Sequence, residues 1–247
     1  SYWAQIQAMV DAGADVFVTN TDTDAVNLRE RVGDIPIVFG RSDDPVATGA
    51  VEDLVTPGGT MTGNITNRPH ERRLQVLTEI NPATDRVYYL YGSQTGEAET
   101  VLAQVLAVAE ELNIEVIPAP IADLESGLEA LENIPDGADW LFLTPYVPYA
   151  QEFSQALLTV SETYQIPISY FMFVPVQGYL MGYGPDIDAS DRQAARQVDR
   201  ILRGASPAIL PVQTAENYLY INLEAAETLH MEIPANMSTQ QPTAPTV

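Results

Sequence analysis

Short apolar runs alternate with longer segments of helical periodicity along almost the whole sequence. The runs are rich in Val, Ile, Leu, Phe and Tyr and lack a strict apolar–polar alternation, which predicts strands buried on both faces. The predicted strands lie at residues 15–19, 35–39, 61–65, 86–91, 114–118, 139–144, 166–171, 180–184, 210–213 and 218–222. The predicted helices lie at residues 1–12, 23–32, 45–54, 70–80, 97–112, 124–131, 148–164, 188–202 and 223–229. This order indicates an α/β fold with parallel sheets and helices on both faces.

The predicted strands are too many for one small sheet, so the 247 residues are expected to form two doubly wound, Rossmann-like lobes. The expected crossing points between the lobes lie near residues 64–68, 171–176 and 184–188. We assign residues 1–65 and 186–210 to an N-terminal lobe, and residues 66–185 and 211–236 to a C-terminal lobe. Residues 237–247 have a low-complexity composition and are expected to form a disordered tail.

The charge of the chain excludes one class of partner. The formal net charge is −23, and all 11 basic residues are arginines. Nucleic-acid binding depends on Lys and Arg neutralising phosphates, so no nucleic-acid partner is expected. Repulsion would also keep such a chain from an anionic membrane surface. The acidity itself is typical of a highly soluble protein, and adaptation to salt or to an acidic exterior is an open alternative.

The sequence lacks the residues that common catalytic and metal sites need. It contains no cysteine, which excludes disulfides, thiolate metal sites and cysteine nucleophiles. A phosphate-binding loop needs a lysine, and there is none; a G-x-S-x-G motif is absent as well. The two histidines, His70 and His230, are far apart and each falls in a predicted helix. We therefore expect no catalytic residue, no metal site and no cofactor.

Six segments resemble a known family when taken in order. They are DPVATGAVEDLVTPGGTMTG (44–63), LQVLTEINPATDRVYYLY (74–91), IPISYF (166–171), GYLMGYG (178–184), ARQVDRILRGASPAILPV (195–212) and YINLEAAETLHMEIP (220–234). The first is similar to the DPV…PGG…TG signature of ABC-transporter substrate-binding proteins of the tryptophan/tyrosine-type group. The resemblance covers almost the whole chain as far as Pro234.

This resemblance implies the type I periplasmic-binding-protein fold, with two lobes joined by three hinge crossovers and the solute held between them. It implies a small-molecule solute, an ABC permease in the membrane as the partner, and a monomer without catalytic activity. The expected location is periplasmic or extracellular, with a lipoprotein anchor as one means of membrane association. Family members begin with a strand, a helix and a second strand before the position of Ser1, so the first strand-helix-strand of the N-terminal lobe is expected to be missing here.

Candidate ligand-binding residues follow from one rule: in an open α/β sheet, ligands bind in the loops just beyond the carboxyl ends of the strands. In the N-terminal lobe the candidates are Asn20, Thr21, Arg41, Ser42, Asp43, Asn64 and Thr66. In the C-terminal lobe they are Ser93, Gln94, Thr95, Tyr146, Met172 and Phe173, and Tyr183 and Asp186 lie near the last predicted crossover.

Most of these candidates also have a purely structural interpretation. The polar residues after the first strand could cap the following helix, and so could Ser93, Gln94 and Thr95. Arg41 could hold a carboxylate ligand in bidentate fashion or pair with a nearby aspartate, Asp43 or Asp44. The aromatic cluster of Tyr170, Phe171 and Phe173 could belong to the core rather than to a ligand-binding wall.

Three functions remain open at this point. The first is the solute-binding component of an ABC importer for an aromatic or apolar amino acid or a similar solute. Family members commonly place a small residue and then an acid or another polar residue after the strand that corresponds to IPISYF, whereas this chain has Phe171, Met172 and Phe173. The solute is therefore expected to be more apolar, or not to be an amino acid. The second is a ligand-sensing domain of a signalling protein with the same fold. The third is an enzyme on a Rossmann-like scaffold.

Overall fold

The structure is a computed structural model that describes residues 2–66, 69–94, 98–145, 147–148, 150–173 and 175–237. The chain divides into two compact units, Ser1–Arg68 with Pro185–Asn217 and Pro69–Gly184 with Tyr218–Val247. The sequence placed one crossover near 171–176, but these residues belong to the second unit, and the third passage of the chain falls between Asn217 and Tyr218. Residues 211–217, assigned from sequence to the C-terminal lobe, belong to the first unit.

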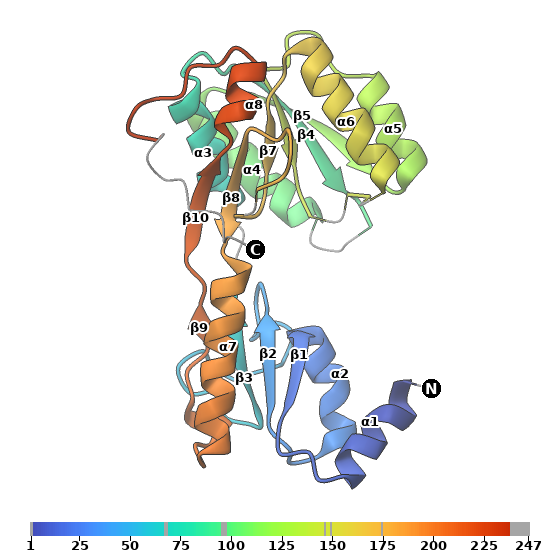
Figure 1. The fold of residues 1–247 in the computed structure, drawn as a ribbon, viewed down its shortest axis with the longest axis vertical. Helices are drawn as coiled ribbons and strands as arrows, with labels where there is room; N and C mark the ends of the chain where they lie inside the picture. Colours follow the sequence, from blue (N-terminus) through green and yellow to red (C-terminus); the bar gives the residue numbers. More distant parts are fainter. Residues whose placement is uncertain are drawn as a thin grey trace. The chain divides into compact units, whose positions relative to one another are not determined.

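The first unit is a parallel sheet with helices on both faces (Figure 1). Its described strands, in sheet order, are β1 (Phe17–Thr21), β2 (Ile37–Arg41), β3 (Met61–Ile65) and β9 (Gln213–Thr214). The helices are α1 (Tyr2–Asp11), α2 (Asp22–Val32), α7 (Ile187–Leu202) and the short 3₁₀ turn η1 (Pro207–Ile209). The pairing of β9 with β3 explains why residues 211–217 belong to this unit.

Strand β2 shows why both faces of this sheet are covered. Ile37 and Phe39 pack into a cluster with residues of α1 and α2, whereas Val38 packs on the other face against Ala194 and Ile201 of α7. Successive side chains of a strand point to opposite faces, so an unbroken apolar run needs a helix layer on each side. The sequence pattern therefore predicted the layers correctly.

The second unit is a larger sheet of the same kind. Its described strands lie in the order β10-β8-β7-β6-β4-β5, and the pairs from β8 to β5 are parallel. The strands are β4 (Arg86–Gly92), β5 (Glu115–Ile121), β6 (Trp140–Leu143), β7 (Ile168–Tyr170), β8 (Met181–Pro185) and β10 (Asn217–Ile221). The helices are α3 (His70–Ile80), α4 (Ala98–Leu112), α5 (Leu124–Glu132), α6 (Gln151–Tyr164) and α8 (Leu223–Thr228).

The two faces of this second sheet carry separate cores. On β4, Val87, Tyr89 and Tyr91 pack with residues of α3, α4 and α8. The alternate residues Tyr88 and Leu90 pack on the opposite face with residues of α5 and α6. Both units are therefore doubly wound α/β structures, which confirms the predicted fold class.

Three strands of the first unit begin later than the sequence predicted. The strand predicted at 15–19 is β1, the one predicted at 35–39 is β2, and the one predicted at 210–213 is β9, which follows η1 in the chain. Pro36 has no N–H to donate to a neighbouring strand, and its carbonyl oxygen accepts the hydrogen bond from Phe17 N (2.8 Å) that starts the pairing. The pairing then continues through Thr21 and Arg41, two residues beyond the apolar runs.

The helix predicted at 45–54 is wrong: this segment consists of turns. Thr48 N bonds to Asp44 O at 3.2 Å, which is a single helical turn, and Gly49 then takes a positive φ of 74°. The hydroxyls of Thr48 and Ser42 both donate to Oδ2 of the buried Asp22, each at 2.6 Å. A tertiary bond to α2, which no local pattern reveals, therefore fixes the path of this segment.

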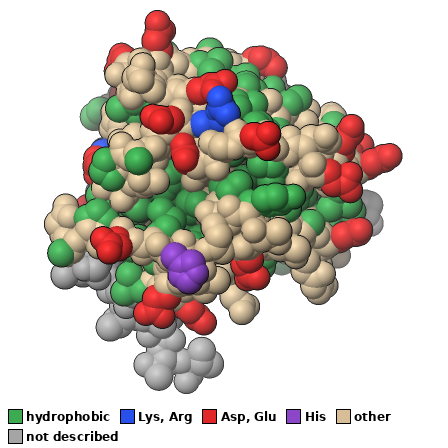
Figure 2. Space-filling view, turned by 90° about the horizontal axis from the view of Figure 1, so that it is seen from above, with side chains coloured by type: hydrophobic (Ala, Val, Ile, Leu, Met, Phe, Trp, Pro, Cys, Tyr) green, Lys and Arg blue, Asp and Glu red, His purple; other side chains and the backbone are tan. Residues whose placement is uncertain are grey.

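Acidic side chains are scattered over the face of the molecule that Figure 2 shows. On the face drawn in Figure 2, they are spread among uncharged side chains, and basic side chains show at few places. No group of three or more His, Asp or Glu residues in the described parts of the chain could hold a metal ion. Within the same residues, every helix is too short or too polar to span a bilayer.

Gly63 is predicted to be essential for the packing of β3 on β2. A Cβ at this position would overlap the backbone oxygen and the ring of Phe39, whereas a Cβ at Gly59 would meet nothing within 4 Å. We expect Gly63→Ala to lower the free energy of unfolding by about 3 kcal/mol in urea denaturation. The matched variant Gly59→Ala should change it little, and equal effects of the two substitutions would contradict this packing argument.

Asp22 is predicted to stabilise the first unit through its carboxylate. In Asp22→Ala the hydroxyl of Ser42 loses its acceptor, and the hydroxyl of Thr48 keeps only its longer contact with the backbone oxygen of Pro45 (3.3 Å). Hydrogen bonds to a charged group are worth about 1.5–3 kcal/mol each before relaxation. We therefore expect a clear drop in the melting temperature. Asp34→Ala removes an exposed acid and serves as the control; an Asp22→Ala protein as stable as that control would show that the bonds contribute nothing.

Candidate functional site

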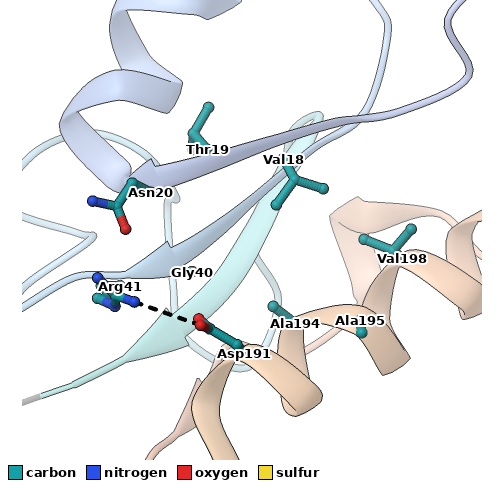
Figure 3. Close-up of a pocket in the computed structure, with 9 residues that line it drawn as sticks. All are labelled: Val18, Thr19, Asn20, Gly40, Arg41, Asp191, Ala194, Ala195 and Val198. Atoms are coloured by element: carbon teal, nitrogen blue, oxygen red, sulfur yellow. Dashed lines mark ion pairs between the residues drawn. The ribbon is translucent and has the colours of Figure 1, made fainter. Parts of the chain in front are cut away.

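A cavity of about 480 Å³ opens in the first unit where β1 and β2 face α7 (Figure 3). Two residues predicted from sequence, Asn20 and Arg41, line this cavity. The complete lining is Val18, Thr19, Asn20, Gly40, Arg41, Asp191, Ala194, Ala195 and Val198. The cavity lies at the carboxyl half of the two strands, the side of a parallel sheet on which ligands bind.

The cavity has a charged end and an apolar wall. Arg41 Nη2 lies 3.5 Å from Asp191 Oδ2, and Figure 3 shows this pair between the end of β2 and the first half of α7. The pair is partly exposed and contributes little stability. Arg41 Nε is buried and has no hydrogen-bond partner, so the guanidinium keeps donor capacity for a ligand. The apolar wall is formed by Val18, Ala194 and Val198.

The residues that end β1 serve different roles. Asn20 is exposed at the cavity, whereas Thr21 caps α2: its Oγ1 accepts from Asp24 N at 3.1 Å and donates to Asp24 Oδ2 at 2.8 Å. Both residues belong to the strand itself and not to the loop that the sequence predicted after residue 19. Thr21 therefore has the helix-capping role that the sequence offered as the alternative to ligand binding.

Two further candidates of the first unit hold the fold together. Ser42 is buried, and its hydroxyl donates a hydrogen bond to Asp22 Oδ2, so the hydroxyl proton is already used within the protein. Asn64 is fully buried, and its Nδ2 donates to the backbone oxygen of Ser190 at 2.7 Å, which ties β3 to α7. The Oδ1 atom of Asn64 has no hydrogen-bond partner.

The remaining candidates of this unit lie at the ends of β2, β3 and β8. Asp43 is exposed in the turn after β2. Thr66 follows β3; its N–H bonds to Ser42 O at 2.8 Å, and its hydroxyl is buried without a partner. Asp186 caps α7 by accepting from Ala189 N at 3.0 Å.

In the second unit, the candidates lie around the carboxyl ends of β4, β7 and β8. Ser93 and Gln94 are exposed in the turn after β4. Met172 and Phe173 are half-buried after β7, and the Phe173 ring lies 5.3 Å from that of Tyr218. Tyr183 is half-buried on β8. The predicted residues Thr95 and Tyr146 lie outside the described residues.

The aromatic residues after β7 divide between core and surface. Phe171 is only 3% exposed and packs against Tyr170, with ring centroids 4.4 Å apart. Phe173 is more accessible and stays a candidate for ligand contact. The alternative that this cluster is core therefore holds for Phe171.

Sequence reasoning missed Arg73, which is 1% exposed on α3. Its Cζ lies 3.6 Å from the ring centroid of Phe142, and burial lowers the pKa of Arg73 to about 9. Burial also raises the pKa of Tyr89, on the strand next to Phe142. The helical period gave the signal: Arg73 is four and seven residues before Leu77 and Ile80, so it lies on the apolar face of its helix.

A sequence model of the family described as ABC transporter substrate binding protein matches residues 1–243. No curated protein matches the chain. Among solved structures, a conserved domain protein from Vibrio cholerae superposes with a TM-score of 0.76 at 23% identity, over 96% of this chain and 81% of that one.

An ABC domain from Streptococcus pneumoniae in complex with L-Trp has a TM-score of 0.74 at 20% identity, over 96% of this chain and 84% of the other. An open, ligand-free substrate-binding protein with adhesive properties from Clostridium difficile has a TM-score of 0.72 at 19% identity, with 95% and 80% coverage.

These structural similarities confirm the type I periplasmic-binding-protein fold, and the family consists of non-catalytic proteins. The match over nearly the whole chain decides the matter: this chain belongs to the family of ABC transporter substrate-binding proteins.

Proposed function

We propose that the protein is the solute-binding component of an ABC importer and that its solute is an aromatic or apolar amino acid or a similar small molecule. The family match over residues 1–243 carries this proposal. The protein would work outside the cytoplasm, in the periplasm or at the cell exterior, as a monomer that delivers its solute to an ABC permease. A lipoprotein anchor would keep it near that permease.

The first unit supports the proposal with a cavity that has polar donors at one end. Arg41 retains an unused donor, and the exposed Asn20 beside it adds an amide that can both donate and accept. Val18 and Val198 supply an apolar wall. A few convergent polar groups beside apolar side chains are what sites for small organic solutes require.

The second unit supports an aromatic or apolar solute. Met172 and Phe173 follow β7 with part of their side chains accessible, and Phe173 packs beside Tyr218. An aromatic solute buries about 150–250 Å² and gains from edge or offset contact with such rings. The Streptococcus pneumoniae structure that holds L-Trp is similar in fold, which makes tryptophan the first solute to test.

A thermal-shift screen of the natural full-length protein tests this proposal. A solute at roughly 100 times its Kd adds about 2.7 kcal/mol of stability, which corresponds to a rise in melting temperature of about 5 °C or more for a protein of this size. We expect L-tryptophan, L-tyrosine or an apolar amino acid to give such a rise. A panel of amino acids and small metabolites without any shift or calorimetric heat would argue against solute binding.

Phe173→Ala tests the aromatic contact. We expect this variant to bind the identified solute at least 10-fold more weakly by calorimetry, because the ring supplies apolar contact area. Tyr164→Ala is the matched control, since Tyr164 is an exposed aromatic residue at the far end of α6. Unchanged affinity in Phe173→Ala would remove Phe173 from the site.

Uptake measurements separate transport from sensing. Cells that lack the gene should lose high-affinity uptake of the solute if the protein serves an importer. A sensor domain of the same fold would bind the solute equally well and leave uptake unchanged.

A further inference from the structure

Arg73 is a cation that the described part of the protein buries without a counter-ion. Its Nε, Nη1 and Nη2 atoms are all buried and have no hydrogen-bond partner. Its neighbour Arg72 shows the ordinary arrangement, because it is partly exposed and forms an ion pair with Glu79 on the same helix. Helix α3 therefore carries one arginine with a counter-ion and, among the described residues, one arginine without a counter-ion.

The surroundings of Arg73 are defined by one row of side chains across the sheet. Tyr89 of β4, Phe142 of β6 and Ser169 of β7 are neighbours in register, so they lie side by side on the face that α3 covers. The guanidinium lies on the Phe142 ring at 3.6 Å, and Tyr89 stacks on the same ring at 5.5 Å. Ser169, next to Phe142, is fully buried, and its hydroxyl also has no partner.

Helix α3 carries Arg73 in its first turn. The N-cap residue is Pro69, which provides no side-chain hydrogen bond to the first N–H groups of the helix. Those N–H groups carry the positive end of the helix dipole and favour an anion.

If Arg73 and Ser169 were only core residues, they would lack the counter-ion and the hydrogen-bond partners that buried polar groups normally have. A buried charge costs much more than a contact with an aromatic face returns, unless an opposite charge accompanies it. Buried hydroxyls are also normally hydrogen-bonded. Two unpartnered groups beside the same ring, one cationic and one a hydroxyl, match the donors that a carboxylate needs.

We infer that Arg73 and Ser169 bind the carboxylate of the solute, which makes the ligand of this protein a small carboxylic acid such as an amino acid. This inference rests on the proposed function. The guanidinium supplies the charge, the Ser169 hydroxyl donates a second hydrogen bond, and the Phe142 ring holds Arg73 in place before the ligand arrives.

The variant that tests this role should fold well. Arg73→Met keeps a long apolar side chain on Phe142 and removes the buried charge, so we expect a melting temperature at or above that of the natural protein in the absence of ligand. Arg72→Met changes the neighbouring arginine on the same helix and serves as the control. A purely structural role for the Arg73 charge predicts the opposite, a loss of stability in Arg73→Met in every buffer.

Acetate is the probe for the site when no solute is known. We compare melting temperatures in sodium acetate and sodium chloride at equal ionic strength. In the natural protein and in Arg72→Met, acetate should raise the melting temperature relative to chloride by about 3 °C, and in Arg73→Met this difference should vanish. Equal melting temperatures in both salts, or the same difference in Arg73→Met, would overturn the inference.

The solute itself separates this inference from the proposed function. For a solute found in the thermal-shift screen, Arg73→Met should weaken binding at least 100-fold, and the amide of the same solute should bind the natural protein as weakly. A solute that binds Arg73→Met with unchanged affinity overturns the carboxylate site and leaves solute binding intact. An acetate effect that depends on Arg73, in a protein that binds no solute, keeps the anion site and contradicts the transport function.

Discussion

Parallel strand pairing determines where the polar groups of this protein can meet. In each sheet the ladder aligns the carboxyl ends of neighbouring strands along one edge, so residues far apart in sequence become neighbours. In the first unit this alignment brings Asn20 and Arg41 to one cavity. In the second it sets Tyr89, Phe142 and Ser169 in one row. Each proposed contact with a ligand depends on these registers.

Two pairs of buried polar residues differ in their hydrogen bonding. Asp22 and Asn64 have partners inside the first unit, and their bonds fix loops and a helix to the sheet. Arg73 and Ser169 have none among the described residues. Burial without a partner is costly for any polar group. The bonds of Asp22 and Asn64 therefore help to hold the first unit together, and Arg73 and Ser169 are the groups that we propose to bind a ligand.

Family membership and residue chemistry address different questions about this protein. The family establishes a non-catalytic binding protein, and fold similarity at 19–23% identity reaches no further than the fold. The chemical class of the ligand has to be inferred from individual side chains of this protein. After β7 the chain has the uncharged residues Phe171, Met172 and Phe173, whereas Arg73 supplies a cation elsewhere in the same unit. This charge pattern favours recognition of a carboxylate over recognition of an amino group alone.

Much of the fold could be predicted from sequence because it follows from local pattern. The apolar runs and the helical periods gave the strands and helices of both units and their layers, apart from the turn segment at 45–54. The limits of β1 and β2 were wrong by two residues, since hydrogen bonding across the sheet extends each strand past its apolar run. Hydrogen bonding between two strands that are distant in sequence leaves no pattern in the sequence of either strand.

The sequence by itself determined the fold class and the family, because periodicity and ordered motifs are properties of the chain alone. The sequence also led to Asn20 and Arg41, which line the cavity of the first unit but lie within β1 and β2 and not in the loops predicted after them. Only the tertiary structure decided that Ser42, Asn64 and Thr21 are bound into the fold, that Asp191 is the partner of Arg41, and that Arg73 is buried without a partner. The physical reason is that burial and pairing depend on which distant residues pack together, and these are fixed only when the strands align.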